Sequence, residues 1–505
     1  MDKSKNLKIG AVIAYATIAF NIISGLFYTP WIVAQIGDSD YGLYTLANSL
    51  INLFLFDFGL SAATSRFVSK YLAEGRQDKV DRILGAIYKL YFAIDAVFVV
   101  IFVVLSICLE QIYPNLSVLE IRRLRVVFIL SAVFAVANFP CVTFTGILNA
   151  YEKYIALKVA DALYRIFSVV ITVIALLCNG GLYALVSVQV AVGLLVLVYK
   201  FYIIKTGTPV KVDFTTKEKG VFRDLFGFSL WITVSTLAQR LIFGITPSIL
   251  GIVSNTAAIA VFGIVSVLEN YIHLITTALN GMFMPHISRI YTQKDPASKL
   301  NDLIVKVGRF QFALNGLIVT GFFLLGREFV MLWLDETYGA VFYGLLLISV
   351  PNLFYYSLQI ANTAMMIRNR VKIQAITNVA VGILNVALSF VLSKSYGVYG
   401  ACIAIFVAYS IRIIGYFIAY YFILELNIKR IFRECYLPLG MSMVITIALG
   451  LCLKRVVVGD NWISFGIKVV IVGVIYIAAV YAIGMQKQER QQLQAKILGK
   501  FAHKK

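Results

Sequence analysis

A series of long apolar segments, separated by short polar loops, most strongly constrains the fold of this 505-residue chain. A helix needs about 20 apolar residues to cross the hydrocarbon core of a bilayer, and such segments recur along the whole sequence. The chain is 60% hydrophobic and 14% charged, against roughly 45–50% and about 25% in soluble domains. The sequence therefore predicts an all-α integral membrane protein with many spans.

Segmentation at that length gives about fourteen expected spans. Their approximate ranges are 9–35, 41–65, 84–109, 124–149, 156–178, 182–204, 226–252, 257–285, 303–326, 341–366, 373–394, 398–424, 435–453 and 463–485. No cleavage motif follows a short apolar core near the N-terminus, so we expect a retained first helix and not a signal peptide.

Basic residues gather in every second loop, which the positive-inside rule assigns to the cytoplasm together with both termini. The loops after the second and sixth spans are examples, with Lys70, Arg76, Lys79, Arg82, Lys205, Lys211, Lys217, Lys219 and Arg223. Arg122, Arg123 and Arg125 are an exception, because they open the fourth span on the expected outer side. Because such loops account for the net charge of +20, we expect no nucleic-acid partner.

The reactive residue types give no indication of metal, redox or enzyme chemistry. The six cysteines form no CxxC pair, and the histidines at 273, 286 and 503 are scattered. The sequence contains neither an HExxH motif nor a Walker A loop. We therefore expect no metal site, no cofactor and no enzyme activity.

Two halves of the chain resemble each other. The segment "YLAEGRQDKVDRI" after the second span matches "YTQKDPASKLNDL" after the eighth, and "NGGLYAL" matches "SYGVYGA" near the end of each half. Pro30 corresponds to Pro247. Chance similarity between apolar sequences is the alternative, but matched loops and prolines in the same order favour duplication.

Duplication predicts two six-helix bundles related by an axis along the membrane normal, because six is even and both halves start from the same side. The expected parts are an N-terminal bundle at 1–204, a cytoplasmic linker at 205–225, a C-terminal bundle at 226–425, two additional helices at 426–485 and a basic tail at 486–505. The expected substrate site is a central cavity between the bundles. The tail is either an amphipathic helix on anionic lipid or an inert solvated segment.

Polar residues recur along the eighth span at helical spacing: Ser266, Glu269, His273, Thr276 and Asn280. The seventh span carries Thr233, Thr236 and Arg240, and the tenth carries Asn352 and Tyr356. Alignment of Gly42 with Gly263 places Asn48 and Asn52 opposite Glu269 and His273. Such stripes either join helices by hydrogen bonds or line a hydrated path.

Charged residues in the spans are more informative, since each costs about 2.5–3.5 kcal/mol near mid-membrane. Arg240 is expected to be a cavity cation, and its planar fork suits a phosphate. Asp161 and Arg165 are spaced for an internal ion pair, while Glu269 and His273 form either a proton site or a fixed hydrogen bond. The candidate cavity residues are Arg240, Arg412, Glu269, His273, Asn280, Asn48, Asn52, Asp161, Arg165, Thr233 and Thr236, and those for ion coupling are Glu269, His273 and Asp57.

One N-terminal stretch carries a family resemblance. Pro30, Gly37, "YGLY" at 41–44 and "DFGLSAATSRF" at 57–67 occur in the order seen in polysaccharide-biosynthesis flippases of O-antigen and capsule pathways. Those flippases belong to the multidrug/oligosaccharidyl-lipid/polysaccharide transporter superfamily. The resemblance covers nearly the whole chain at the level of hydropathy and duplication.

The resemblance implies a two-bundle fold in a bacterial inner membrane. It also implies alternating-access movement of undecaprenyl-pyrophosphate-linked oligosaccharide from the cytoplasmic to the outer leaflet. A cationic cavity would suit Arg240 and Arg412. The implied partners are the lipid-linked oligosaccharide, membrane lipids, a coupling ion (H⁺ or Na⁺) and other polysaccharide-assembly proteins.

Four alternatives are weighed against this interpretation. A multidrug extruder of the same superfamily would favour unpaired acids such as Glu269, Asp57 and Asp95. A lipid II flippase of the superfamily would also use two extra helices, which are thought to hold the lipid tail. A membrane enzyme or a passive scaffold is a different class, and neither explains the duplicated halves with buried charges.

Overall fold

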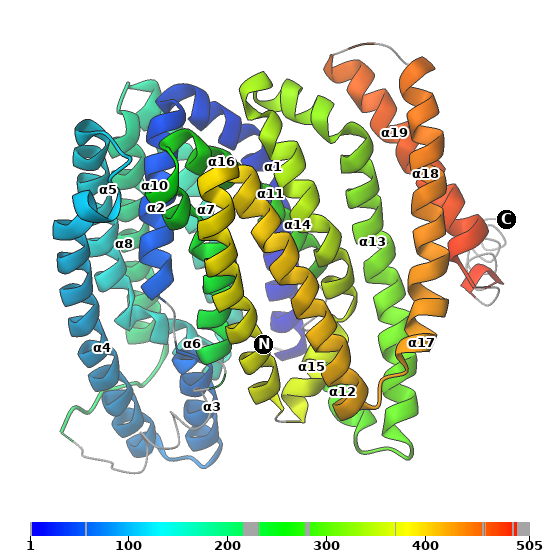
Figure 1. Ribbon diagram of the computed structural model, residues 1–505. Coiled ribbons are helices and arrows are strands. Elements are labelled where there is room, and N and C mark those ends of the chain that lie inside the picture. Colours follow the sequence, from blue (N-terminus) through cyan, green and yellow to red (C-terminus); the bar gives the residue numbers. More distant parts are fainter. Residues whose placement is uncertain are drawn as a thin grey trace, which may run out of the picture. The chain divides into compact units, whose positions relative to one another are not determined.

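The computed structural model describes residues 3–55, 58–215, 231, 233–277, 283–368, 370–456, 459, 461–486 and 489–491, and every regular element within them is helical (Figure 1). Among these described residues, ten helices are long and apolar enough to cross a membrane, or up to twelve if each of two bent pairs is one span. The prediction of an all-α, multi-pass membrane protein is confirmed, while the count of about fourteen spans stays a prediction.

The first eight helices precede the basic linker that the sequence predicts after the sixth span. They are α1 (Lys3–Ile36), α2 (Asp38–Phe54), α3 (Leu60–Ala73), α4 (Gln77–Ile112), α5 (Val118–Asn138), α6 (Thr143–Ala150), α7 (Tyr154–Leu177) and α8 (Gly181–Gly207). The span expected at 41–65 is divided between α2 and α3. Gly59 has φ +69° just before α3 begins, a left-handed conformation that glycine adopts without steric cost.

After the linker, helical residues at 233–239 lead into a π-helical turn at Arg240–Gly244. The chain continues with α10 (Thr246–Val253), α11 (Thr256–Thr277), α12 (Met284–Ile290), α13 (Pro296–Trp333), α14 (Gly339–Ser357), α15 (Gln359–Ile367), α16 (Val371–Leu424), α17 (Ile428–Ile431), α18 (Leu437–Val456) and α19 (Trp462–Ala479). The long α16 has a kink at Gly397 (φ +53°, ψ −130°), which lies between the spans expected at 373–394 and 398–424.

The chain forms two compact units. Unit 1 comprises Met1–Ile264 and Gln374–Ala404, and unit 2 comprises Val265–Ile373 and Ile405–Lys505. Helices α11 and α16 therefore contribute to both units. The domain ranges expected from the internal repeat stay a prediction.

Two glycines that the repeat aligns allow helices of unit 1 to approach closely. A Cβ on Gly42 of α2 would lie 2.3 Å from the backbone oxygen of Thr256 on α11. A Cβ on Gly263 of α11 would lie 2.6 Å from Oγ1 of Thr45 on α2. The glycine of the "YGLY" element thus serves helix packing, which is the usual use of small residues between membrane helices.

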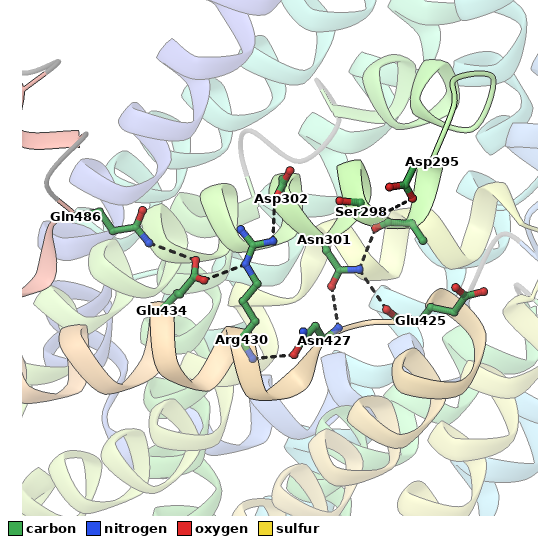
Figure 2. A network of polar contacts seen from close by, with 10 residues as sticks. Asp295, Ser298, Asn301, Asp302, Glu425, Asn427, Arg430, Glu434 and Gln486 are labelled. Atoms are coloured by element: carbon green, nitrogen blue, oxygen red, sulfur yellow. Dashed lines mark hydrogen bonds and ion pairs between the residues drawn. The ribbon is translucent and has the colours of Figure 1, made fainter.

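In unit 2, the C-terminal helices α18 and α19 pack beside α13 (Figure 1). A chain of polar contacts joins one end of this group, and Figure 2 shows Arg430 between Asp302 and Glu434, with Gln486 on the far side of Glu434. Nη1 of Arg430 lies 2.7 Å from Asp302 and Nε lies 3.0 Å from Glu434. These contacts tie α17 and the turn before α18 to α13.

Arg309 of α13 is a buried residue of the same region, with 6% of its surface exposed. Its Nη2 donates to Glu489 at 2.8 Å and to the carbonyl of Gly484 at 2.6 Å, and its Nη1 donates to the carbonyl of Glu434. Burial alone would raise the pKa of Glu489, but the hydrogen bonds and charge of Arg309 outweigh it and lower that pKa. One guanidinium therefore ties the segment before α18 and the segment after α19 to α13.

We predict that Arg309→Met lowers the apparent melting temperature in detergent, because it leaves buried carbonyls and Glu489 without their donor. Breaking such a pair from one side costs about 3–5 kcal/mol. Arg433→Met is the matched control, since Arg433 lies in the same region and is exposed. Equal melting temperatures for the two variants would contradict this role.

We also predict that Glu489→Gln lowers the melting temperature and that this loss of stability shrinks as the pH falls below about 4.3, the usual carboxyl pKa. The reason is that Glu489, whose pKa is lowered, stabilises the fold only while its carboxyl group is ionised.

Candidate functional site

A buried polar group in unit 2 surrounds Glu269 of α11. Its Oε1 accepts a hydrogen bond from Nδ2 of Asn352 at 2.9 Å and another from the hydroxyl of Tyr356 at 2.6 Å, both on α14. Of the two alternatives open for Glu269 and His273, a fixed hydrogen bond between them is absent among the described residues, and the carboxylate is bonded to α14 instead. The exposed His273 stays close, because its ring centroid is 5.7 Å from that of Tyr356, whose hydroxyl binds Glu269.

Arg412 of α16 lies in the same part of unit 2, with 3% of its surface exposed. Its Cζ is 4.2 Å from the ring centroid of Tyr355 and 4.1 Å from that of Tyr409. Contacts of this kind contribute about 2 kcal/mol or more when desolvated. Among the described residues, no carboxylate oxygen lies within 4.0 Å of the Arg412 guanidinium.

These residues form what we call the Glu269–Arg412 cluster: Glu269, His273, Asn352, Tyr355, Tyr356, Tyr409 and Arg412. It holds one acid and one guanidinium, each held by aromatic or amide side chains of the cluster. Asn352 and Tyr356 lie four residues apart on α14, a spacing visible in the sequence. Tyr355 and Tyr409 were not expected, because they come from different helices and no local pattern relates them to Arg412.

Arg240 lies in unit 1, at the start of the π-helical turn Arg240–Gly244. It is half-buried, and its Nη1 donates to the backbone carbonyl of Asn52 on α2. The turn is fixed by two further side chains. Nδ2 of Asn385 donates to the carbonyls of Leu241 at 3.2 Å and Ile242 at 2.7 Å, and the Ser49 hydroxyl donates to the carbonyl of Gly244.

A cavity of about 300 Å³ lies within unit 1, between α2, α5, α7 and α8. We call it the amide cavity, after its polar side chains: Asn48, Asn52, Ser131, Asn138, Tyr164 and Gln189. Its remaining lining residues are apolar, and none of its lining residues is charged. The predicted site residues Asn48 and Asn52 thus lie together, and Arg240 is bonded to the backbone of one of them.

The predicted Asp161–Arg165 ion pair is wrong. Asp161 lies 3.1 Å from Nζ of Lys200 on α8 and 3.7 Å from Nζ of Lys158. The spacing of four residues on α7 allowed the Arg165 pair, but a lysine from the neighbouring helix competes for the same carboxylate. Nε of Arg165 is buried without a hydrogen-bond partner in the described part of the chain.

The other predicted residues have separate surroundings. Thr276 joins helices, since its hydroxyl donates to Oδ1 of Asn315 on α13 at 2.7 Å. Thr233 is half-buried and Thr236 is exposed in unit 1. Asp57 and Asn280 lie outside the described residues.

The helices and their hydropathy define a multi-pass membrane protein. The model of the family described as "Polysaccharide biosynthesis protein" matches residues 7–291, more than half of the chain. The chain therefore belongs to the polysaccharide biosynthesis protein family, as its N-terminal motifs indicate. A comparison with curated proteins finds no match.

Solved transporters of the multidrug/oligosaccharidyl-lipid/polysaccharide (MOP) superfamily share the fold. The lipid II flippase MurJ, in an inward closed conformation, has a TM-score of 0.74 at 16% identity and covers 93% of this chain and 98% of its own. An inward-facing multidrug resistance MATE family transporter has a TM-score of 0.70 at 12% identity, with coverages of 82% and 98%. The Vibrio cholerae MATE transporter VcmN in the bent form has a TM-score of 0.56 at 12% identity, with coverages of 84% and 98%.

We predict that Glu269 and Arg412 are energetically coupled. Glu269→Gln and Arg412→Met should each lower the melting temperature in detergent, because each leaves the opposite charge buried alone. The double variant should lose less free energy of unfolding than the sum of the two single variants' losses, by roughly 0.5–3 kcal/mol. Glu269→Gln combined with Arg370→Met, an exposed arginine of unit 2, should be additive. If the effects of the two substitutions simply add in the Glu269–Arg412 pair, as they should in the Glu269–Arg370 pair, the coupling is refuted.

Proposed function

We propose that this protein is a flippase that moves an undecaprenyl-pyrophosphate-linked oligosaccharide from the cytoplasmic to the outer leaflet for surface-polysaccharide synthesis. Membership of the polysaccharide biosynthesis protein family and the MOP fold give the class. A sugar head group with a charged pyrophosphate cannot cross hydrocarbon unaided. A polar site within the membrane, combined with alternating access, removes that barrier.

The observation that carries the proposal is the half-buried guanidinium of Arg240 beside the amide cavity. A guanidinium supplies paired donors that match phosphate oxygens. The adjacent amides and hydroxyls suit the uncharged part of a glycan head group. Arg412 is a weaker candidate for direct contact, because it is packed between two tyrosine rings with 3% exposure.

A second feature suits the lipid part of such cargo. Helices α13 and α19 line an open apolar cavity of about 370 Å³ in unit 2. Its lining residues have no charged side chain, and Phe322, Phe329 and Phe465 are among them. We assign to the two additional C-terminal helices the task of holding the prenyl tail while the head group crosses.

The Glu269–Arg412 cluster suits a role in energy coupling. Protonation of Glu269, or binding of a sodium ion there, would change the net charge next to Arg412 and so alter the balance between two conformations. We place the protein in a bacterial inner membrane, with both termini in the cytoplasm. Other proteins of surface-polysaccharide assembly would supply and consume the cargo.

A drug or cation antiporter of the same superfamily is the second candidate. The acid of Glu269 among tyrosines favours it, because aromatic rings and a carboxylate together bind organic cations. The nearby positive charge of Arg412 works against cation binding at that place. Cation efflux from vesicles without any movement of lipid-linked sugar would support the antiporter.

We predict that Arg240→Ala lowers export of surface glycan about 10-fold or more in a strain lacking the native gene. The estimate follows from the loss of a charge-assisted hydrogen bond, about 1.5–3 kcal/mol. Arg240→Lys should be intermediate, because lysine keeps the charge but loses the planar fork. Arg122→Ala, an exposed arginine of the same unit, is the control. Wild-type export by both Arg240 variants, at equal protein level, would remove Arg240 from the site.

A further inference from the structure

Three arginines at the start of α5 lie where the positive-inside rule expects few basic residues. Arg123 is accounted for within the fold, because its Nη1 donates to Asp40 of α2 at 2.8 Å. Arg122 is exposed and has no ion pair or hydrogen bond with another described residue. Neither Arg122 nor Arg125 takes part in the proposed movement of cargo, so their presence at this end of α5 points to a different anionic partner.

Arg125 has part of its hydrogen-bonding capacity unused. Its Nε donates to the carbonyl of Ser106 and its Nη2 to Glu110, each at 3.2 Å and both on α4. Its Nη1 donates to no other described residue. The Glu110 side chain is 65% exposed, and an ion pair with so exposed a partner stabilises little. Arg122 and Arg125 together therefore carry two positive charges against the single negative charge of Glu110.

An apolar groove of about 400 Å³ lies between α4 and α5 within unit 1. Its lining residues are apolar apart from Ser106, whose carbonyl binds Arg125. Phe102 and Phe128 are buried lining residues with ring centroids 5.9 Å apart, whereas the lining residue Val103 is exposed. The groove therefore offers hydrocarbon a packed apolar surface that is open at one side.

Helical spacing places the unsatisfied arginines and the groove on the same face of α5. The members of this face follow one another at steps of three, four, four and three residues: Arg122, Arg125, Ile129, Val133 and Val136. Such steps bring side chains to one side of an α-helix, and the last three residues line the groove. The bond from Arg125 to the lining residue Ser106 places the charged groups at one end of the groove.

The length of the groove suits one lipid chain. On α4 its lining residues extend from Val99 to Ile107, which corresponds to about 12 Å at 1.5 Å per residue. One leaflet contributes about 15 Å of the roughly 30 Å hydrocarbon core, so the groove matches an acyl chain of a single leaflet. A membrane-spanning helix of a partner protein, or of a second copy of this chain, would cross both leaflets and extend well beyond the groove.

We propose that the groove between α4 and α5, together with Arg122 and Arg125, binds a phospholipid with an anionic phosphodiester head group. One acyl chain lies along the groove, and the guanidinium groups donate to the phosphate oxygens. The topology expected from the loop charges places this lipid in the outer leaflet. The proposal does not depend on which cargo the protein moves.

The lipid site is separate from the amide cavity, although α5 contributes to both. Phe134 and Asn138 line the amide cavity, and helical spacing places them on a different side of α5 from Ile129 and Val133 of the groove. A lipid in the groove therefore leaves the proposed site of the cargo head group free. For this reason we expect Arg122→Ala by itself to keep normal export.

Native mass spectrometry of the purified full-length protein in detergent tests the proposal. Phosphatidylglycerol is the anionic probe, and phosphatidylethanolamine with the same acyl chains is the zwitterionic probe. We expect phosphatidylglycerol to bind about 10-fold more tightly, because each arginine near a membrane surface favours an anionic lipid about fivefold. Equal affinities for the two lipids would overturn the proposal. Binding of undecaprenyl phosphate in preference to phosphatidylglycerol would also overturn it, since the groove would then belong to the cargo.

Charge variants test the contacts with the head group. Arg122→Ala combined with Arg125→Ala should weaken phosphatidylglycerol binding about 10-fold. Arg123→Gln is the control and should bind as the wild type does, because that side chain binds Asp40 of α2. Glu110→Gln should strengthen binding, since it removes the negative charge that competes with the phosphate for Arg125. Damage to the fold cannot strengthen binding, so unchanged or weaker binding by Glu110→Gln would contradict the proposed contacts.

Filling the groove tests the site of the acyl chain. Val103→Trp should weaken phosphatidylglycerol binding about 10-fold, because the chain loses apolar contact area. Val104→Trp is the matched control, since Val104 does not line the groove and is exposed to the same extent, 52% against 53%. Equal binding by these two variants would contradict the site. A protein dimer that Val103→Trp alone dissociates, without bound lipid, would assign the groove to a second copy and overturn the proposal.

A variant that does not fold, as judged by size exclusion, leaves the proposal testable. The contrast between the two phospholipids in the wild-type protein and the gain in Glu110→Gln then decide it. Failure of the flippase function would appear separately, as selective phospholipid binding without movement of lipid-linked cargo.

Discussion

The structure depends on how each ionised side chain within an apolar helix bundle is satisfied. An unpaired charge near the middle of a membrane costs several kcal/mol, and the chain offsets this cost in three different ways. Arg309 binds a carboxylate and two carbonyls, and Arg412 is packed between two tyrosine rings. Arg240 donates to a backbone carbonyl beside a polar cavity. Only the third arrangement combines a guanidinium with space for a ligand.

The two units divide the chemistry unequally. Unit 1 contains an uncharged cavity with Arg240 at one of its lining residues, whereas unit 2 contains the acid and guanidinium of the Glu269–Arg412 cluster and an apolar cavity between α13 and α19. The two units therefore carry different residues at their polar positions. Such a division suits cargo with a sugar, a pyrophosphate and a lipid tail, which need three different surroundings.

The sequence predicts much of the fold, because lipid imposes one hydropathy pattern and one secondary structure on every span. The polar spacing also identifies Asn48, Asn52, Arg240 and Glu269 as residues to examine. What it does not reveal are contacts between helices that lie far apart in the chain. The packing of Tyr355 and Tyr409 against Arg412 is one example. The ion pair of Asp161 with Lys200, formed in place of one with Arg165, is another. Both depend on tertiary packing that no local period encodes.

Reconstitution tests the central claim most directly. The purified protein, as the sole protein in vesicles, is supplied with a labelled undecaprenyl-pyrophosphate oligosaccharide on one leaflet, and a membrane-impermeant reagent reports the amount on each side. The account predicts that the cargo reaches the opposite leaflet chemically unchanged and faster than in protein-free vesicles. Cargo that stays on its original leaflet under an imposed H⁺ or Na⁺ gradient of either direction, or cargo that emerges chemically altered, would contradict it.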